Sequence, residues 1–181
     1  MIQKYQDDFM HEECWILSFA GGFQRAKVYQ GEVSEAKRAQ FREDLRTYVE
    51  KDILPAYQQK VSEEQHLKNI ESVAAYAIQN FASILNNEKL NIGIAQKLLN
   101  PQLKYLWCRG KVITPPHFPV DRIIQEKLKM NPIINWTSMQ TLAEYSQVIE
   151  HAKRVAAKMP DCCIDGEVSL ALWELISFQR K

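Results

Sequence analysis

The sequence predicts an all-α protein of six or seven helices, folded as one compact domain over residues 1–181. Apolar residues recur at spacings of three and four along most of the chain, which is the period of one helix face. Capping residues precede these stretches, and short turns rich in glycine, asparagine or proline follow them. No linker, internal repeat or low-complexity tract divides the chain, which favours a single domain.

The clearest element is a helix over residues 62–85. Ser62 and Gln65 have the spacing of a capping box, in which each side chain satisfies a backbone donor of the other. Behind them runs an almost unbroken apolar stripe, which we interpret as core. Its members are Leu67, Ile70, Val73, Ala74, Ala77, Ile78, Phe81, Ile84 and Leu85.

Other helices are expected over residues 5–20, 34–55, 92–107, 121–128 and 137–156, and a last one from Asp165 or Gly166 onward. Gly21 and Gly22 are expected to end the first helix, and a short extended piece over residues 23–31 follows.

Two details of the later helices follow from single residues. Pro101 predicts a kink or a restart at Asn100, because proline removes a backbone donor and crowds the preceding turn. Thr137, with Gln140 three residues on, predicts the cap of the helix that follows.

Composition is that of a globular protein, with 46% apolar and 25% charged residues. No apolar run approaches the roughly 20 residues that span a bilayer, and the N-terminus lacks the pattern of a signal peptide. We therefore expect a cytoplasmic protein. The cysteines and histidines lack metal-ligand spacing, so no metal, cofactor or disulfide is predicted. The sequence carries no prediction of oligomeric state.

Charge is unevenly distributed along the chain. Residues 97–130 contain seven lysines and arginines and two carboxylates, a net charge of +5, whereas the whole chain carries +1. The remainder therefore carries −4. A basic segment on an otherwise acidic protein is typical of a face that binds a polyanion, and also of ordinary solvated surface.

The segments around Lys97 and Asp121 contain residues suited to chemistry on a sugar. A glycine at a helix hairpin, Gly93, permits close approach of a partner, and exposed amides at a helix N-terminus can hold a phosphate. A neutral lysine amine can attack a sugar C1′ or form a Schiff base. Asp121 follows a stiff proline-rich loop, so its carboxylate is held in a fixed orientation at a helix start.

These two segments resemble motifs of the helix-hairpin-helix DNA glycosylase superfamily, which includes endonuclease III and the 8-oxoguanine glycosylases. The hairpin pattern is matched by Gly93-Ile94-Ala95-Gln96-Lys97, with Ala95 where the family has a second glycine. The downstream pattern is matched by Pro119-Val120-Asp121-Arg122-Ile123. The resemblance implies an all-helical fold, Lys97 as the lyase nucleophile and Asp121 as the catalytic carboxylate.

The same resemblance implies DNA as the partner and DNA repair as the role. A flipped base would enter a pocket beside Lys97 and Asp121, and Trp107, His117 and Phe118 could stack on it, although Trp107 and Phe118 also fit ordinary core positions. The residues expected to bind nucleic acid are Gly93, Lys104, Arg109, Lys111, His117 and Arg122.

Two other functions compete with this one. The first is a non-catalytic helical module that binds nucleic acid or a protein through the basic face of residues 97–129. The second is a small-molecule or toxin-type helical enzyme. The sequence lacks a glycine-rich phosphate loop, a His-Glu-x-x-His motif and the Arg/His signature of helical ribonucleases, which places this second alternative last.

Overall fold

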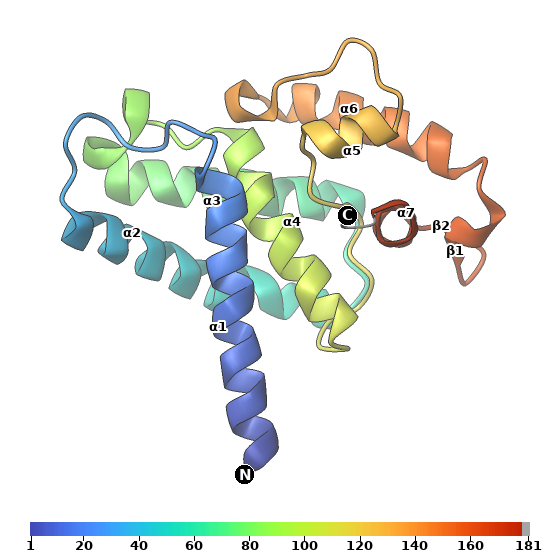
Figure 1. Cartoon of the computed structure of the whole chain (residues 1–181), viewed down its shortest axis with the longest axis horizontal. Coiled ribbons are helices and arrows are strands. Elements are labelled where there is room, and N and C mark those ends of the chain that lie inside the picture. Colours follow the sequence, from blue (N-terminus) through green and yellow to red (C-terminus); the bar gives the residue numbers. More distant parts are fainter. Residues whose placement is uncertain (179–181) are drawn as a thin grey trace.

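Helices form most of the computed structural model, which describes residues 1–178 (Figure 1). The α-helices of this part of the chain are α1 (Ile2–Phe23), α2 (Glu35–Tyr48), α3 (Glu63–Phe81), α4 (Ile92–Cys108), α5 (Arg122–Lys127), α6 (Leu142–Ala156) and α7 (Leu170–Ser177). Two short strands, β1 (Cys163–Ile164) and β2 (Glu167–Val168), form an antiparallel hairpin. The predicted all-α class with six or seven helices is confirmed.

Helix α4 lies at the centre of the molecule. Every residue of its first twelve, 92–103, is buried. Helices α1, α3 and α6 and the 3₁₀ turn Trp136–Ser138 all pack against it, and Figure 1 shows α1 crossing it. A helix that is buried on all sides must satisfy its polar side chains within the protein, which determines how the candidate site is built.

The buried apolar side chains form one hydrophobic core, whose first and last members along the sequence are Trp15 and Trp173. At one end, aromatic rings from three helices pack together: Phe41 of α2 lies 6.0 Å from Phe23 of α1 and 5.0 Å from Phe81 of α3, measured between ring centroids. Offset and edge-on aromatic pairs of this kind add to the stabilisation from buried area.

The predicted end of the first helix at Gly21-Gly22 is wrong, because α1 continues to Phe23. Gly22 is buried against α4, where an added Cβ would lie 3.2 Å from Leu98 Cδ2. The glycine therefore permits close packing of two helices rather than a turn. The extended piece after it is reduced to a single antiparallel bridge between Tyr29 and Leu85.

The predicted restart at Asn100 is absent, since α4 runs as one helix through Pro101. Pro101 removes the hydrogen bond to the carbonyl of Lys97, four residues earlier. Packing on all sides of α4 holds the helix together across this gap.

Two predicted helix starts are wrong. Thr137 lies in the 3₁₀ turn, and the capping box of α6 is formed by Thr141 and Glu144 instead. Asp165 and Gly166 do not begin α7; they form the tip of the β1–β2 hairpin, with φ of 51° and 80°. An Asp-Gly pair at positive φ is the favoured two-residue hairpin turn.

The Ser62 cap is confirmed, since its side chain accepts a hydrogen bond from the Gln65 amide. The reciprocal half of the predicted box is replaced, because the Gln65 side chain donates to Asn69 instead.

Candidate active site

Lys97 and Asp121 form a direct ion pair. The Lys97 Nζ lies 3.1 Å from Asp121 Oδ2, although 24 residues separate the two in the chain. Lys97 comes from the middle of α4, and Asp121 caps α5 by accepting a hydrogen bond from the Ile124 amide at Oδ1. One carboxylate oxygen therefore fixes the helix, and the other faces the amine.

The pair is largely withdrawn from water but reaches the surface. The Lys97 side chain is 11% exposed and that of Asp121 is 24% exposed. The Lys97 Nζ also lies 5.7 Å from the centroid of the buried Trp136 ring. Removing charges from water costs free energy, so each of the two depends on the other.

Gln96 holds the Asp121 loop in register with α4. Its side-chain amide donates to the Val120 carbonyl and accepts from the Val120 amide, at 2.7 and 2.9 Å. One turn later, Asn100 donates to the Phe118 carbonyl at 2.9 Å. Both amide side chains are fully buried. They fix the backbone immediately before Asp121. The two sequence motifs do not predict this role.

Gly93 serves packing within the protein. A Cβ at this position would lie 1.7 Å from the Trp136 carbonyl oxygen, so only glycine lets the Trp136–Ser138 turn approach α4. The Gly93 amide donates to the Met139 carbonyl. The structure thus places this predicted nucleic-acid ligand against protein backbone, with its amide already occupied.

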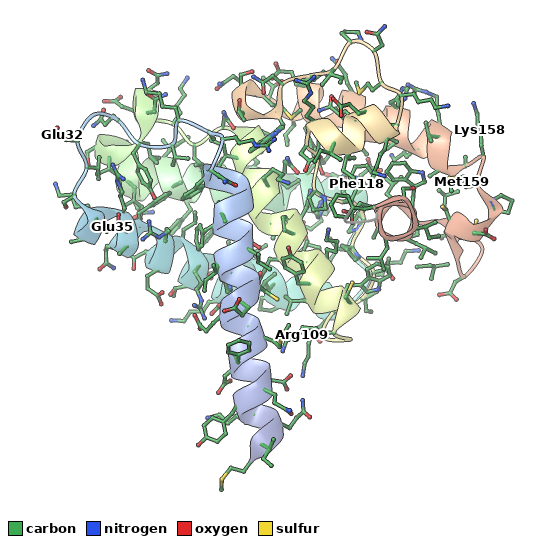
Figure 2. All side chains as sticks on the ribbon, viewed as in Figure 1. Glu32, Glu35, Arg109, Phe118, Lys158 and Met159 are labelled. Atoms are coloured by element: carbon green, nitrogen blue, oxygen red, sulfur yellow. The ribbon has the colours of Figure 1, made fainter. Side chains whose placement is uncertain are left out.

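The four predicted cations of the basic face are each paired with a carboxylate. The pairs are Lys104–Glu174 at 2.8 Å, Arg109–Asp7 at 3.0 Å, Lys111–Asp7 at 3.0 Å and Arg122–Glu126 at 2.8 Å. Arg109 lies at the far end of α4, beside α1 (Figure 2). Positive charge that looks continuous in the sequence is therefore divided among separate ion pairs.

The proposed stacking residues belong mainly to the core. Phe118 is buried beside α7, with its ring centroid 5.5 Å from that of Trp173 (Figure 2). His117 is buried as well, and Trp107 is half-buried. None of the three makes a recorded contact with Lys97 or Asp121 in the described part of the chain.

His117 is part of a separate buried polar network. Asn100 donates to the Tyr145 hydroxyl, so the hydroxyl proton is left to bind His117 Nδ1, each at 3.0 Å. The neutral ring then carries its proton on Nε2, which lies 3.4 Å from a Glu63 carboxylate oxygen. Burial lowers the pKa of His117, although the Glu63 carboxylate opposes this shift.

A second buried histidine lies beside the first. The ring centroids of His66 and His117 are 4.6 Å apart. The Tyr57 hydroxyl accepts from Asn69 and lies 2.7 Å from His66 Nδ1. Burial, and then the neighbouring His117, hold the pKa of His66 well below its usual value.

This network ends at a cavity of about 590 Å³, between the start of α3, the proline-rich loop and the β1–β2 hairpin. Glu63 and His117 lie in its wall, together with Lys153, whose Nζ is 2.6 Å from Glu63. Hydrogen bonding from His117, and then from Lys153, lowers the pKa of Glu63 to about 2. The charged groups of this wall thus pair with one another.

Further features bear on cofactors and membranes. Within residues 1–178 no group of three or more His, Cys, Asp or Glu side chains is placed to hold a metal ion, and the four cysteines are free. No helix in the same range has the length and apolar character needed to cross a bilayer.

Comparisons of the chain with protein-family models, with curated proteins and with solved structures return no match.

Proposed function

We propose that this chain is a glycosylase/lyase-like enzyme that acts on a damaged or modified base in DNA, with Lys97 as nucleophile and Asp121 as the assisting carboxylate. The observation that carries the proposal is the 3.1 Å contact between Lys97 Nζ and Asp121 Oδ2. Two residues singled out by their motifs, far apart in the chain, meet as an amine and a carboxylate in a largely water-excluded place.

The proposed reaction uses both groups. The lysine ammonium first gives up a proton, for which Asp121 Oδ2 is the acceptor in reach. The neutral amine attacks C1′ of the sugar, the bond from C1′ to the base breaks, and the base leaves with the electron pair and takes the proton that Asp121 had accepted. The Asp121 carboxylate, charged again, stabilises the positive charge on the amine that is now joined to C1′.

At an abasic site the same amine adds to the C1′ aldehyde. Loss of one water leaves an iminium ion joining Lys97 to the sugar. Borohydride delivers hydride to this carbon and yields a stable secondary amine. The covalent adduct is therefore a direct measure of the proposed nucleophile.

Binding of the DNA backbone would use cations that are exposed and able to exchange partners. Of the four ion-paired cations described above, Arg122 and Lys111 have the most exposed side chains, at 72% and 47%. Exposed ion pairs contribute about 0–1 kcal/mol, so phosphates can compete with their present carboxylates. Binding should weaken as salt rises.

The experiment is borohydride trapping with duplexes that contain an abasic site, 8-oxoguanine or uracil. Lys97→Met keeps the length and apolar stem of the side chain beside Trp136 and removes the amine. Asp121→Asn removes the charge and retains an oxygen to cap α5. The control is Lys153→Met, because Lys153 is a half-buried, ion-paired helix lysine outside the residues predicted to bind nucleic acid.

We expect an adduct with the native chain and with Lys153→Met, none with Lys97→Met, and a rate reduced at least tenfold with Asp121→Asn. Circular dichroism confirms that each variant is folded. An adduct that survives Lys97→Met, or no adduct and no base release on any duplex with folded protein, would contradict the proposal. Salt-dependent DNA binding without chemistry would then assign the chain to the alternative, a non-catalytic binding module.

A further inference from the structure

The outward face of α1 is apolar. Ile2, Tyr5, Phe9 and Ile16 are 74%, 66%, 62% and 58% exposed. At 100° per residue these four positions fall within a sector of about 60°, so they share one side of the helix, with Glu12 and Glu13 in the turn between Phe9 and Ile16. We call these four residues the outer stripe.

The outer stripe lies opposite the face by which α1 joins the protein. The buried residues of α1 are Cys14, Trp15, Ser18 and Gly22, and they lie on the other side of the helix. A surface helix ordinarily presents polar residues to water. In α1 both faces carry apolar residues, and on the outer face Ile16 borders a groove shared with α2.

The packing of α1 against α4 keeps the outer stripe facing outward, and ion pairs add to this contact. The Asp7 carboxylate forms ion pairs with Arg109 and Lys111, which follow the end of α4. Glu12 receives Arg46 of α2. Figure 1 shows the first turns of α1 projecting beyond the other helices, and the residues of the outer stripe in these turns are exposed.

We propose that the outer stripe is the contact by which two copies of this chain associate, with their α1 helices antiparallel. A two-fold interface must be self-complementary, so that residue i meets residue j and j meets i. Ile2 and Ile16 each lie seven residues from Phe9. With Phe9 on the two-fold axis, Ile2 of each copy therefore packs on Ile16 of the other.

Polar groups fit the same register. Tyr5 comes opposite Glu13 of the second copy, so its hydroxyl can donate to that carboxylate. Glu12 and Glu13, in the turn between Phe9 and Ile16, border the outer stripe on its two sides. Acidic residues at its borders, Asp8 and Glu12, disfavour the other common occupant of an apolar helix face, an anionic membrane surface.

The interface is small. From the exposed fractions, the outer stripe contributes about 500 Å² per copy, or roughly 1,000 Å² in the pair, at the lower end for specific protein interfaces. We therefore expect a reversible dimer that depends on concentration. This inference is independent of the chemistry proposed for Lys97 and Asp121.

The test is sedimentation of the full chain over a wide range of concentration, with Phe9→Glu as the disrupting variant. Two glutamates would meet on the axis, whereas Phe9 is too exposed for this change to unfold the monomer. Ile78→Glu, an exposed apolar residue on α3, is the matched control. We expect dimers for the native chain and for Ile78→Glu, and monomers for Phe9→Glu.

A cysteine pair tests the register. Under mild oxidation, Phe9→Cys should form an intermolecular disulfide well above the background from the exposed Cys108 and Cys163, and Gln3→Cys, away from the stripe, should not. A native chain that stays monomeric at all concentrations overturns the proposal, as does a dimer that Phe9→Glu leaves intact. Binding of the native chain to neutral vesicles through Phe9, without dimers, overturns it as well.

Discussion

Gly93 shows how one missing side chain can determine local architecture. The Trp136 carbonyl oxygen occupies the space that a Cβ at Gly93 would take, and backbone cannot move aside as the end of a long side chain can. The contact also brings the Trp136 ring to Lys97. A residue suggested by a hairpin motif thus acts here through packing.

Gly93→Ala should destabilise the protein by about 3 kcal/mol, the upper part of the usual range for overpacking, because the added methyl overlaps a backbone oxygen. Urea unfolding at neutral pH measures this. Gly21→Ala is the control, since nothing lies within 4 Å of its Cβ position in α1. Helix propensity predicts no loss there and a gain of up to about 1 kcal/mol. Equal stability of the two variants would contradict the packing role of Gly93.

At the residue scale, the local sequence pattern predicts which residues belong to the candidate site better than it predicts which groups they contact. The spacing of Lys97 and Asp121 in their motifs singled them out, and the structure places them together. The roles of Gln96 and Asn100 could not be predicted, because they bind backbone groups about 20 residues away. The sequence does contain a signal for this role, because two amide side chains lie one turn apart on a helix that is buried.

At the scale of the elements, α6 shows that capping-box spacing in the sequence does not always form a helix cap. Both Thr137 and Thr141 precede an acid or amide at capping-box spacing, namely Gln140 and Glu144. Thr137 is engaged by Asn135 in the 3₁₀ turn, whereas Thr141 receives the Glu144 amide and Glu144 binds the Thr141 amide.

Thr141→Ala should therefore cost about 1 kcal/mol of unfolding free energy, the usual value of an N-cap, and Thr137→Ala distinctly less. Thermal melting of the two variants beside the native chain provides the comparison. The reverse order would place the functional cap at Thr137 and contradict the assigned start of α6.

Helices were predictable as elements and less so at their ends. Periodicity depends on many residues, so the stripe of α3 survives any single exception. Ends depend on one or two residues whose effect the surroundings can reverse. Gly22 packs instead of breaking α1, and Pro101 is carried within α4 by burial on all sides. Asp165-Gly166 is itself a hairpin signal, read here as a helix start.

For the whole molecule, the buried histidine network links distant parts of the fold. It joins α3 through His66, the proline-rich loop through His117 and α6 through Tyr145. Both histidines have pKa values lowered by burial, so both are neutral in the folded protein near neutral pH. Unfolding exposes them to water, where each takes up a proton below about pH 6.5.

Stability should therefore be present in full above pH 6.5 and fall as the pH is lowered below it. The unfolded chain binds more protons there, with a slope of up to about 1.4 kcal/mol per pH unit for each histidine. Urea unfolding between pH 7.5 and 5 measures this slope. Glu63, with its pKa of about 2, stays charged in the folded protein across that range.

His66→Gln is the variant for this prediction, because glutamine keeps an acceptor for the Tyr57 hydroxyl and cannot titrate. Its slope between pH 6.5 and 5 should be shallower than that of the native chain. Identical slopes would exclude His66 as a source of the pH dependence.

At the scale of the whole molecule, the sequence does not predict how the helices pack against one another. The count and class of helices follow from local periodicity, but the pairing of Arg109 and Lys111 with Asp7 joins residues about 100 positions apart. No local rule predicts such contacts, in which two cations of the basic segment share one carboxylate of α1. Charge along the chain therefore does not predict a continuous basic face in the folded protein.

The central position of α4 also affects the order in which the protein can be made. A ribosome releases α1, α2 and α3 first, and the helix against which α1 and α3 pack emerges only afterwards. Until residue 108 has left the exit tunnel, Trp15 and Val73 have no complete core to enter. The apolar side chains of α1 and α3 therefore stay exposed until α4 emerges, which favours aggregation of the nascent chain.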